Sequence, residues 1–256
     1  MSDVAPDVEP EVPGNRSPTV RSSGAQISGA QSPTAQSPTA QSPTAKSTGG
    51  VRRRRILDAA IDIFAHKGFE GATWRTIAAR AGVTQGLIRF YFVDKEGLWK
   101  AAYESARERR MADTPPDVVV KNRRADPEDV KRWLRGYARH VARFPQEARM
   151  LVHDSRVQDG AATSRLQWAA DAFIREDQAA FVRAVRDLKA VGWFRGIAPE
   201  EILYLMSGAA QYRFLVPGEC LAVRGEDTRA AEVVEQHVEA VVALFMAHAP
   251  AEQGAE

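Results

Sequence analysis

The side chains best suited to recognise a nucleic acid lie close together, between Trp74 and Tyr91. An arginine such as Arg75 can donate two hydrogen bonds to the O6 and N7 atoms of guanine, or it can hold a phosphate. A glutamine such as Gln85 can pair with adenine through its amide group. The residue types in this stretch therefore predict contacts with base edges.

The spacing of apolar residues divides the second half of this stretch into two faces. Ile88 and Phe92 lie four residues apart, so they share the inner face of a helix. The outer face then mixes polar and large apolar side chains: Gln85, Gly86, Leu87, Arg89, Phe90 and Tyr91. Because a soluble protein exposes such a group mainly where a partner binds, this face predicts a binding surface.

Two short helices are expected to position these side chains. Thr73 is a suitable N-cap for the first helix, whose inner face includes Ile77 and Ala81. Gly82 can then adopt a positive φ in a tight turn, and Thr84 can cap the second helix. Two short helices joined by a glycine turn form a helix-turn-helix, whose second helix fits the major groove of DNA.

This arrangement resembles the DNA-binding domain of the TetR family of transcriptional regulators. The resemblance rests on motifs in a specific order: Arg54, Ile56-Leu57, Ala59-Ala60, Phe64, Gly68-Phe69, Thr73, Ile77-Ala78, Ala81-Gly82-Val83, Phe92 and Lys95-Glu96-Gly97-Leu98. Membership would imply a homodimer, a divergent C-terminal ligand-binding domain and, usually, repression of neighbouring genes. The C-terminal part is also loosely similar to the pyrimidine-responsive branch of the family, which does not identify its ligand.

The resemblance further implies DNA contacts at particular positions. They are Thr73, Trp74, Arg75, Thr84, Gln85, Gly86, Leu87, Arg89, Phe90, Tyr91 and Lys95. Leu87 stands where a smaller residue is usual, which favours a van der Waals contact with a thymine methyl group. Lys95 matches a residue that holds a phosphate. Phe90 either contacts the DNA backbone or packs on the first helix of the domain.

Four consecutive arginines, Arg52 to Arg55, precede the expected start of the first helix at Ile56. A run of charge is often only a solvated face, but this one adjoins the recognition helix. We expect Arg53 and Arg54 to contact phosphates or the minor groove as part of an arm. Such contacts would set the affinity for DNA and its salt dependence.

Composition and charge divide the 256-residue chain into three parts. Residues 1–50 repeat the unit Gln-Ser-Pro-Thr-Ala and contain few large apolar side chains, which predicts disorder. Residues 51–111 carry 13 Lys and Arg against 7 Asp and Glu, whereas residues 112–256 carry 19 against 22. The basic part is therefore the one expected to meet a polyanion.

The apolar spacing after Val51 is helical throughout, so we expect an all-α protein of about nine helices. A three-helix N-terminal helix-turn-helix domain would precede a larger helical C-terminal domain. The expected boundaries are a disordered tail at 1–50, the DNA-binding domain at 51–94, a connecting helix at 95–111, a ligand-binding and dimerisation domain at 112–248, and a flexible C-terminus at 249–256.

Aromatic and polar side chains beyond the DNA-binding domain predict a largely apolar pocket for a small-molecule effector. The candidates are Trp99, Tyr103, Trp133, Tyr137, Arg149, His153, Trp168, Phe173 and Gln211. Each aromatic residue alone could instead belong to a core. Arg149 either binds an acidic ligand or pairs with Glu147 or Asp154. A ligand that binds better to the conformation in which the recognition helices are wrongly spaced for DNA would release the DNA. The connecting helix would transmit this change from the pocket to the recognition helix.

Two apolar stripes near the C-terminus predict the dimer interface. They are Ile202, Leu205, Met206, Ala209 and Ala210 on one helix, and Val234, Val238, Val241, Val242 and Phe245 on the other. In the family the corresponding helices pack against their symmetry mates. Both stripes could instead be internal core.

Other classes of protein fit the sequence less well. The chain lacks the common catalytic motifs, and its histidines lack metal-ligand spacing, so we expect no enzyme, cofactor or metal. Control of DNA binding by a protein partner stays an alternative. The single Cys220 is either a redox switch or a buried filler. Without a membrane-length apolar run or a signal-peptide core, we expect a cytoplasmic protein.

Overall fold

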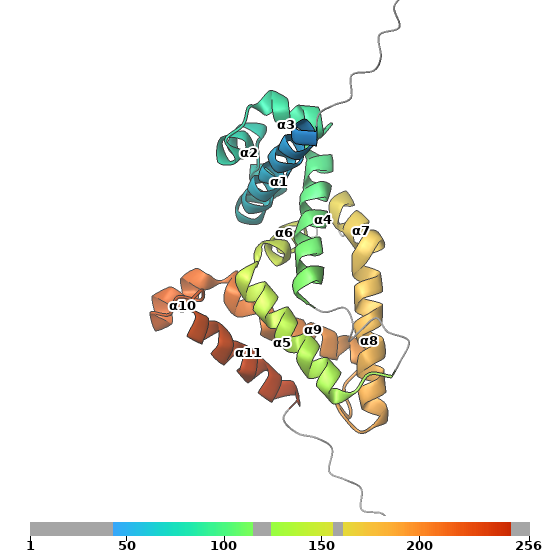
Figure 1. Cartoon of the computed structure of the whole chain (residues 1–256). Helices are drawn as coiled ribbons and strands as arrows, with labels where there is room; N and C mark the ends of the chain where they lie inside the picture. The colour runs from blue at the N-terminus through green and yellow to red at the C-terminus, as the bar shows by residue number, and fades with distance from the viewer. Residues whose placement is uncertain (1–42, 115–123, 156–160, 247–256) are drawn as a thin grey trace, which may run out of the picture. The chain divides into compact units, whose positions relative to one another are not determined.

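The computed structural model describes residues 43–114, 124–155 and 161–246, with side chains from Gly49 onward. Within these ranges the chain is helical and contains no strand, as expected for an all-α protein (Figure 1). The tail expected before Pro43 and the C-terminus expected after Met246 lie outside the described residues.

Three helices form the N-terminal domain: α1 (Pro43–Gly71), α2 (Trp74–Ala81) and α3 (Gln85–Tyr91). Fully buried side chains of all three meet in one core, among them Phe64, Ile77 and Ile88. Their spacing along each helix is the one read from the sequence, because a helix brings residues three or four apart onto one face.

Local signals fix the turn between α2 and α3. Thr73 and Thr76 form a reciprocal capping box at the start of α2, and the Thr84 hydroxyl accepts the amide of Leu87 at the start of α3. Gly82 has φ 63° and ψ 42°, the left-handed conformation that favours glycine. A Cβ atom there would also lie 2.9 Å from the guanidinium of Arg55. The turn therefore requires the glycine, whereas the exposed Arg55 side chain could move aside.

Helix α1 differs from the sequence expectation at both ends. It begins at Pro43 and includes the four arginines, so Arg53 and Arg54 lie on a helix and not on an extended arm. This corrects the expected boundary at Val51. Gly68 has a positive φ, as expected, but its ψ of 179° makes a kink, after which one helical turn continues to Gly71.

The other helices are α4 (Lys95–Asp113), α5 (Pro127–Arg143), α6 (Gln146–Asp154), α7 (Ser164–Ala169), the π-helical segment η2 (Ala170–Ile174), α8 (Arg175–Ala190), α9 (Pro199–Leu215), α10 (Pro217–Arg224) and α11 (Ala231–Met246). Helices α7, η2 and α8 follow one another without a break and are counted here as one helix. The described residues then form ten helices, where the sequence predicts about nine. Pro145 and Pro217 each stand where a new helix starts, α6 and α10 respectively.

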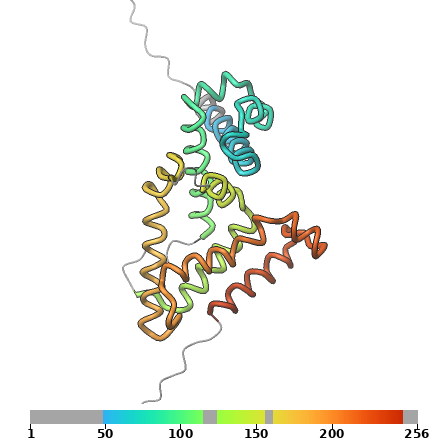
Figure 2. Tube along the Cα trace, turned by 180° about the vertical axis from the view of Figure 1, so that it is seen from behind, coloured from blue at the N-terminus to red at the C-terminus, as the bar shows by residue number. Residues whose placement is uncertain are grey.

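Two large hydrophobic cores result, beside a small cluster of Val141, Ala142 and Phe214. The first joins α1–α4 with Met150 of α6 and Ala169 of α7, so it extends beyond the DNA-binding domain. The second joins α5, α8, α9 and α11. Helix α4 contacts α1, α5 and α6, and Figure 2 shows it running from the α1–α3 domain into the remaining helices. In the described part of the chain, no helix has the length and hydropathy needed to span a bilayer.

Candidate functional site

The outer face of α3 presents four exposed residues: Gln85, Gly86, Arg89 and Phe90. Phe90 is 80% exposed, although phenylalanine is among the residues most often buried. Its ring meets only the edge of Tyr91, at 5.3 Å between centroids. The alternative that Phe90 packs on α1 is therefore excluded in this conformation.

The expectation of full exposure is wrong for Leu87 and Tyr91. Both are half-buried and pack against the first core, because they flank the buried Ile88 on a helix of only two turns. The Tyr91 hydroxyl donates a hydrogen bond of 3.2 Å to the Gly49 carbonyl. This contact ties the N-terminal turns of α1 to the recognition helix.

Helices α1 and α2 add basic side chains beside α3. Arg53 and Arg54 are exposed, and the Arg53 guanidinium lies 5.5 Å from the centroid of the Phe92 ring. Arg75 is exposed at the start of α2, next to a half-buried Trp74. The Arg89 guanidinium lies 5.8 Å from the Trp74 ring, so α2 and α3 present one joint surface.

Three other predicted DNA contacts have partners inside the protein. The hydroxyls of Thr73 and Thr84 cap α2 and α3. The Lys95 ammonium donates to the Phe69 carbonyl at 2.9 Å and lies 4.1 Å from the Phe69 ring. Its contact with a phosphate stays a prediction, because the ammonium serves here to join α4 to the end of α1.

A cavity of about 250 Å³ lies between α4, α5, α6, α8 and α9. Four of the nine predicted ligand residues line it, namely Tyr103, Trp133, Tyr137 and Gln211. The Trp133 and Tyr137 rings stack at 5.0 Å with an interplanar angle of 6°, and Phe181 approaches Trp133 at 4.7 Å. Aromatic walls therefore dominate the cavity.

The other five predicted ligand residues lie elsewhere. Trp99, Trp168 and Phe173 belong to the first core or pack against it. Arg149 donates to the Phe214 carbonyl at 2.9 Å, and neither Glu147 nor Asp154 is its partner, since these pair with other arginines. His153 packs against Gly68. These five placements correct the expected pocket, because helical spacing cannot distinguish a core from a cavity.

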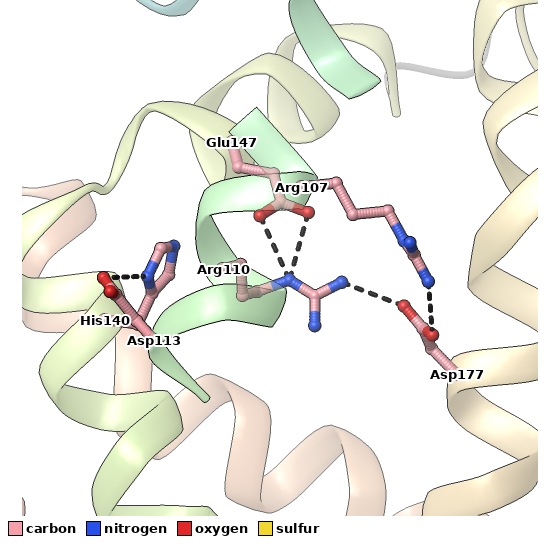
Figure 3. A network of polar contacts seen from close by, with 6 residues as sticks. All are labelled: Arg107, Arg110, Asp113, His140, Glu147 and Asp177. Atoms are coloured by element: carbon pink, nitrogen blue, oxygen red, sulfur yellow. Dashed lines mark hydrogen bonds and ion pairs between the residues drawn. The ribbon is translucent and has the colours of Figure 1, made fainter. Parts of the chain in front are cut away.

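A network of buried charges at the cavity was missed from the sequence (Figure 3). The Arg110 Nε atom donates to both carboxylate oxygens of Glu147, at 3.2 and 3.1 Å, and its Nη2 donates to Asp177 at 2.9 Å. Arg107 donates to the other oxygen of Asp177 at 2.8 Å. The network joins α4 to α6 and α8. The residues lie far apart in sequence, so no local spacing could have indicated their pairing.

His140 completes the polar lining of the cavity. Its ring is buried, and Nδ1 lies 3.2 Å from Asp113 Oδ2. Burial lowers the pKa of His140, against the opposing effect of Asp113, so the neutral ring is favoured. With the Nδ1 proton directed at the carboxylate, Nε2 is a hydrogen-bond acceptor. That atom is buried and has no hydrogen-bond partner among the described residues.

Low polarity also affects other groups around the cavity. Burial raises the pKa of the Tyr137 hydroxyl and of the Glu147 carboxyl, and for Glu147 the nearby Arg110 opposes the rise. Among the described residues no group of three or more His, Cys, Asp or Glu side chains could hold a metal ion. The cavity thus combines aromatic walls with a few polar groups, as small-molecule sites do.

The apolar surface of α9 is not confined to one side. Ile202, Met206 and Ala210 of the predicted stripe are buried within the chain, as are Val238, Val241 and Val242 of α11. Leu205 of the predicted stripe is exposed, and so are three large apolar residues outside the stripes: Tyr204 and Tyr212 on α9 and Leu244 on α11. A groove of about 430 Å³ runs between Leu205, Ala209, Leu244 and Phe245. A helix that is apolar all round is usually covered on all sides.

Known proteins resemble the chain in sequence. The family described as "Bacterial regulatory proteins, tetR family" matches residues 56–102. The HTH-type transcriptional repressor SCO4008 of Streptomyces coelicolor is 29% identical over 166 residues, which cover 64% of this chain and 79% of that protein. The regulator BetI of Klebsiella pneumoniae is 47% identical over 51 residues, which cover 20% of this chain and 26% of BetI.

Solved structures share the fold over most of their length. The putative transcriptional regulator SCO4942 of Streptomyces coelicolor has a TM-score of 0.56 at 23% identity and covers 78% of this chain and 99% of its own. AibR, solved in complex with isovaleryl coenzyme A and operator DNA, has a TM-score of 0.60 at 18% identity. The match covers 76% of this chain and 98% of the AibR chain. The matched N-terminal domain and the relatives show that the chain is a DNA-binding transcriptional regulator, and its residues 56–102 are similar to the tetR family of bacterial regulatory proteins.

Proposed function

We propose that this regulator is a repressor that binds a palindromic operator as a homodimer and releases it when a small molecule occupies the cavity. The observation that carries the DNA-binding interface is the exposure of Phe90 beside Gln85, Gly86 and Arg89 on α3. Such a surface is unfavourable in water and is explained by a partner. Base edges and sugar rings offer that partner both apolar and polar contacts.

The roles within this surface follow from side-chain chemistry. Gln85 and Arg75 are exposed and can contact bases directly. Arg53, Arg54 and Arg89 can neutralise phosphates on either side of them. Nothing within the protein requires a glycine at position 86, since a Cβ there would meet only the Thr84 hydroxyl at 3.9 Å. The absent side chain instead permits a close approach of DNA to α3.

A dimer is supported by specificity and by the surface of α9 and α11. One recognition helix covers only a few base pairs, and a two-fold dimer doubles that number. The exposed Leu205 and Leu244 border an apolar groove that a second copy of the chain would cover. The proposed interface consists of these exposed residues. The buried members of the two stripes pack inside the chain and are not part of it.

Control by a small molecule is supported by the position of the cavity. Its lining includes Arg110 of α4 and Glu147 of α6, and α6 packs on α1 of the DNA-binding domain. A ligand that alters the pairing of these two residues would shift α6 and α1 relative to α4. A coupling of about 1–3 kcal/mol would change DNA affinity about 5- to 150-fold.

Selection of bound duplexes from a random pool, with the purified full chain, tests this function. We expect an enriched sequence with two inverted half-sites, about 10 base pairs or a multiple apart. Addition of the low-molecular-mass fraction of a bacterial extract is expected to release that duplex. No enriched sequence would refute the operator, an unsymmetrical single site would refute the dimer, and release only by the protein fraction would refute the small-molecule effector.

A further inference from the structure

The walls of the cavity favour a ligand that contains rings. Rings of Tyr103, Trp133, Tyr137, Phe144 and Phe181 line it. Flat ring systems stack favourably on such walls. The volume of about 250 Å³ lies just below the ~300–1,000 Å³ that is usual for small-molecule sites.

The charges around the cavity neutralise one another. Two guanidiniums, of Arg107 and Arg110, face two carboxylates, of Glu147 and Asp177. Each member has a charge-assisted hydrogen bond within the network (Figure 3). A charged ligand would lose its hydration without gaining an unpaired counter-charge, which is unfavourable in a buried site. The network therefore selects against anions and cations.

Two polar atoms around the cavity lack a partner among the described residues, Nε of Arg107 and Nε2 of His140, and of these two residues only His140 lines the cavity. His140 lines the cavity, and its Nδ1 atom faces Asp113, which leaves Nε2 on the opposite edge of the ring. This buried Nε2 accepts no hydrogen bond from the described residues. A buried acceptor without a donor is costly, so a ligand that supplies the donor gains more than one that does not.

We propose that the cavity binds an uncharged, ring-containing molecule whose hydroxyl or N–H group donates a hydrogen bond to Nε2 of His140. The inference rests on the proposed role of this cavity as the effector site and adds the chemical class of the effector. It also gives His140 a specificity-determining role, in which the contact of Nδ1 with Asp113 leaves Nε2 as the acceptor.

Matched probes test the class by isothermal titration calorimetry on the full chain. 2-Naphthol supplies a ring system and a hydroxyl donor, whereas 2-methoxynaphthalene has the same rings and no donor. 2-Naphthoate carries a negative charge and 2-naphthyltrimethylammonium carries a positive charge. We expect 2-naphthol to bind about 10-fold more tightly than its methyl ether and than either ion. Equal binding by the ether, tighter binding by an ion, or no binding by either uncharged probe would overturn the proposal.

Substitution of His140 tests the assigned atom. In His140→Phe the ring shape is kept and the acceptor is lost, so naphthol and its ether should bind equally. His66→Phe, a change at an exposed histidine of α1, is the control and should keep the preference of about 10-fold. Nitrogen NMR of His140 in the unsubstituted chain gives a second readout that does not depend on how a variant folds. Naphthol should shift the Nε2 resonance and the ether should not, and an unchanged Nε2 resonance would overturn the proposal.

The operator separates failure of this inference from failure of the proposed function. If the small-molecule extract releases the selected duplex while the probes fail, the effector belongs to another chemical class and the repressor function stands. If neither the extract nor any probe releases it, the proposed effector function fails, and this inference fails with it.

Discussion

Phe90 exposes its ring on the recognition helix without a contact to the core. For the free protein this is a cost, since an exposed phenyl ring orders water around it. Removal of the ring should therefore leave the fold intact. What the ring contributes should be measurable only when DNA is present.

We predict that Phe90→Ser leaves the melting temperature unchanged and weakens operator binding about 10-fold, by the loss of roughly 1.5 kcal/mol of apolar contact. Thermal unfolding and fluorescence anisotropy measure the two effects. Val152→Ser, at another exposed apolar residue, is the control and should alter neither. A melting temperature several degrees lower for Phe90→Ser would show that the ring stabilises the fold instead.

His140 should make the stability of the folded chain depend on pH. Burial lowers its pKa in the folded state below the ordinary value of about 6.5. The unfolded chain thus binds a proton more readily, and stability falls as pH drops through about 6.5. We predict a smaller loss between pH 7.5 and 5.5 in His140→Gln, measured by denaturant unfolding, with the exposed His66→Gln as control. Equal losses in all three proteins would contradict the assignment.

Residues close in sequence were predictable and residues far apart were not. The turn around Gly82 and the inner positions Ile77 and Ile88 follow from spacing within twenty residues. The hydrogen bond of Tyr91 to Gly49 depends on α1, whose early start at Pro43 no local signal indicated. The pairing of Arg110 with Glu147 and Asp177 joins positions 37 and 67 residues apart, which helical spacing cannot relate.

At the scale of elements, α4 connects the two functional surfaces. Its first turn is tied to the DNA-binding domain by Lys95, and its last turns are tied to α6 and α8 by Arg107 and Arg110. Arg110 and Glu147 are largely buried, with 17% and 9% of their side chains exposed. Buried pairs are costly to break, because the remaining charge is left without a partner.

We predict that Arg110→Met lowers the free energy of unfolding by about 3 kcal/mol, since it leaves the buried Glu147 carboxylate without its partner, whereas Asp177 keeps its ion pair with Arg107. Arg109→Met is the matched control on the same helix. Arg109 pairs with Asp58 at a more exposed position, where such a pair contributes about 0–1 kcal/mol. Urea unfolding measures both, and similar effects of the two substitutions would refute the structural importance of the buried network.

At the scale of the whole molecule, the exposed apolar residues of α9 and α11 form the proposed dimer interface. Leu244 is 70% exposed at the edge of the apolar groove. We predict that Leu244→Glu converts the dimer to a monomer and weakens operator binding at least tenfold, because one recognition helix then acts alone. Sedimentation velocity measures the first effect and anisotropy the second. The control Val152→Glu should remain a dimer. If Leu244→Glu is also a dimer, the dimer interface does not depend on Leu244.

The most direct test of the α2–α3 surface is the affinity of the full chain for its selected duplex, measured by fluorescence anisotropy at fixed salt. Arg89→Ala removes a charge from the recognition helix, and Arg183→Ala removes the same charge from an exposed position of α8. We predict about a 10-fold loss or more for Arg89→Ala and no change for Arg183→Ala. Equal affinities of the two variants would show that the outer face of α3 does not contact DNA.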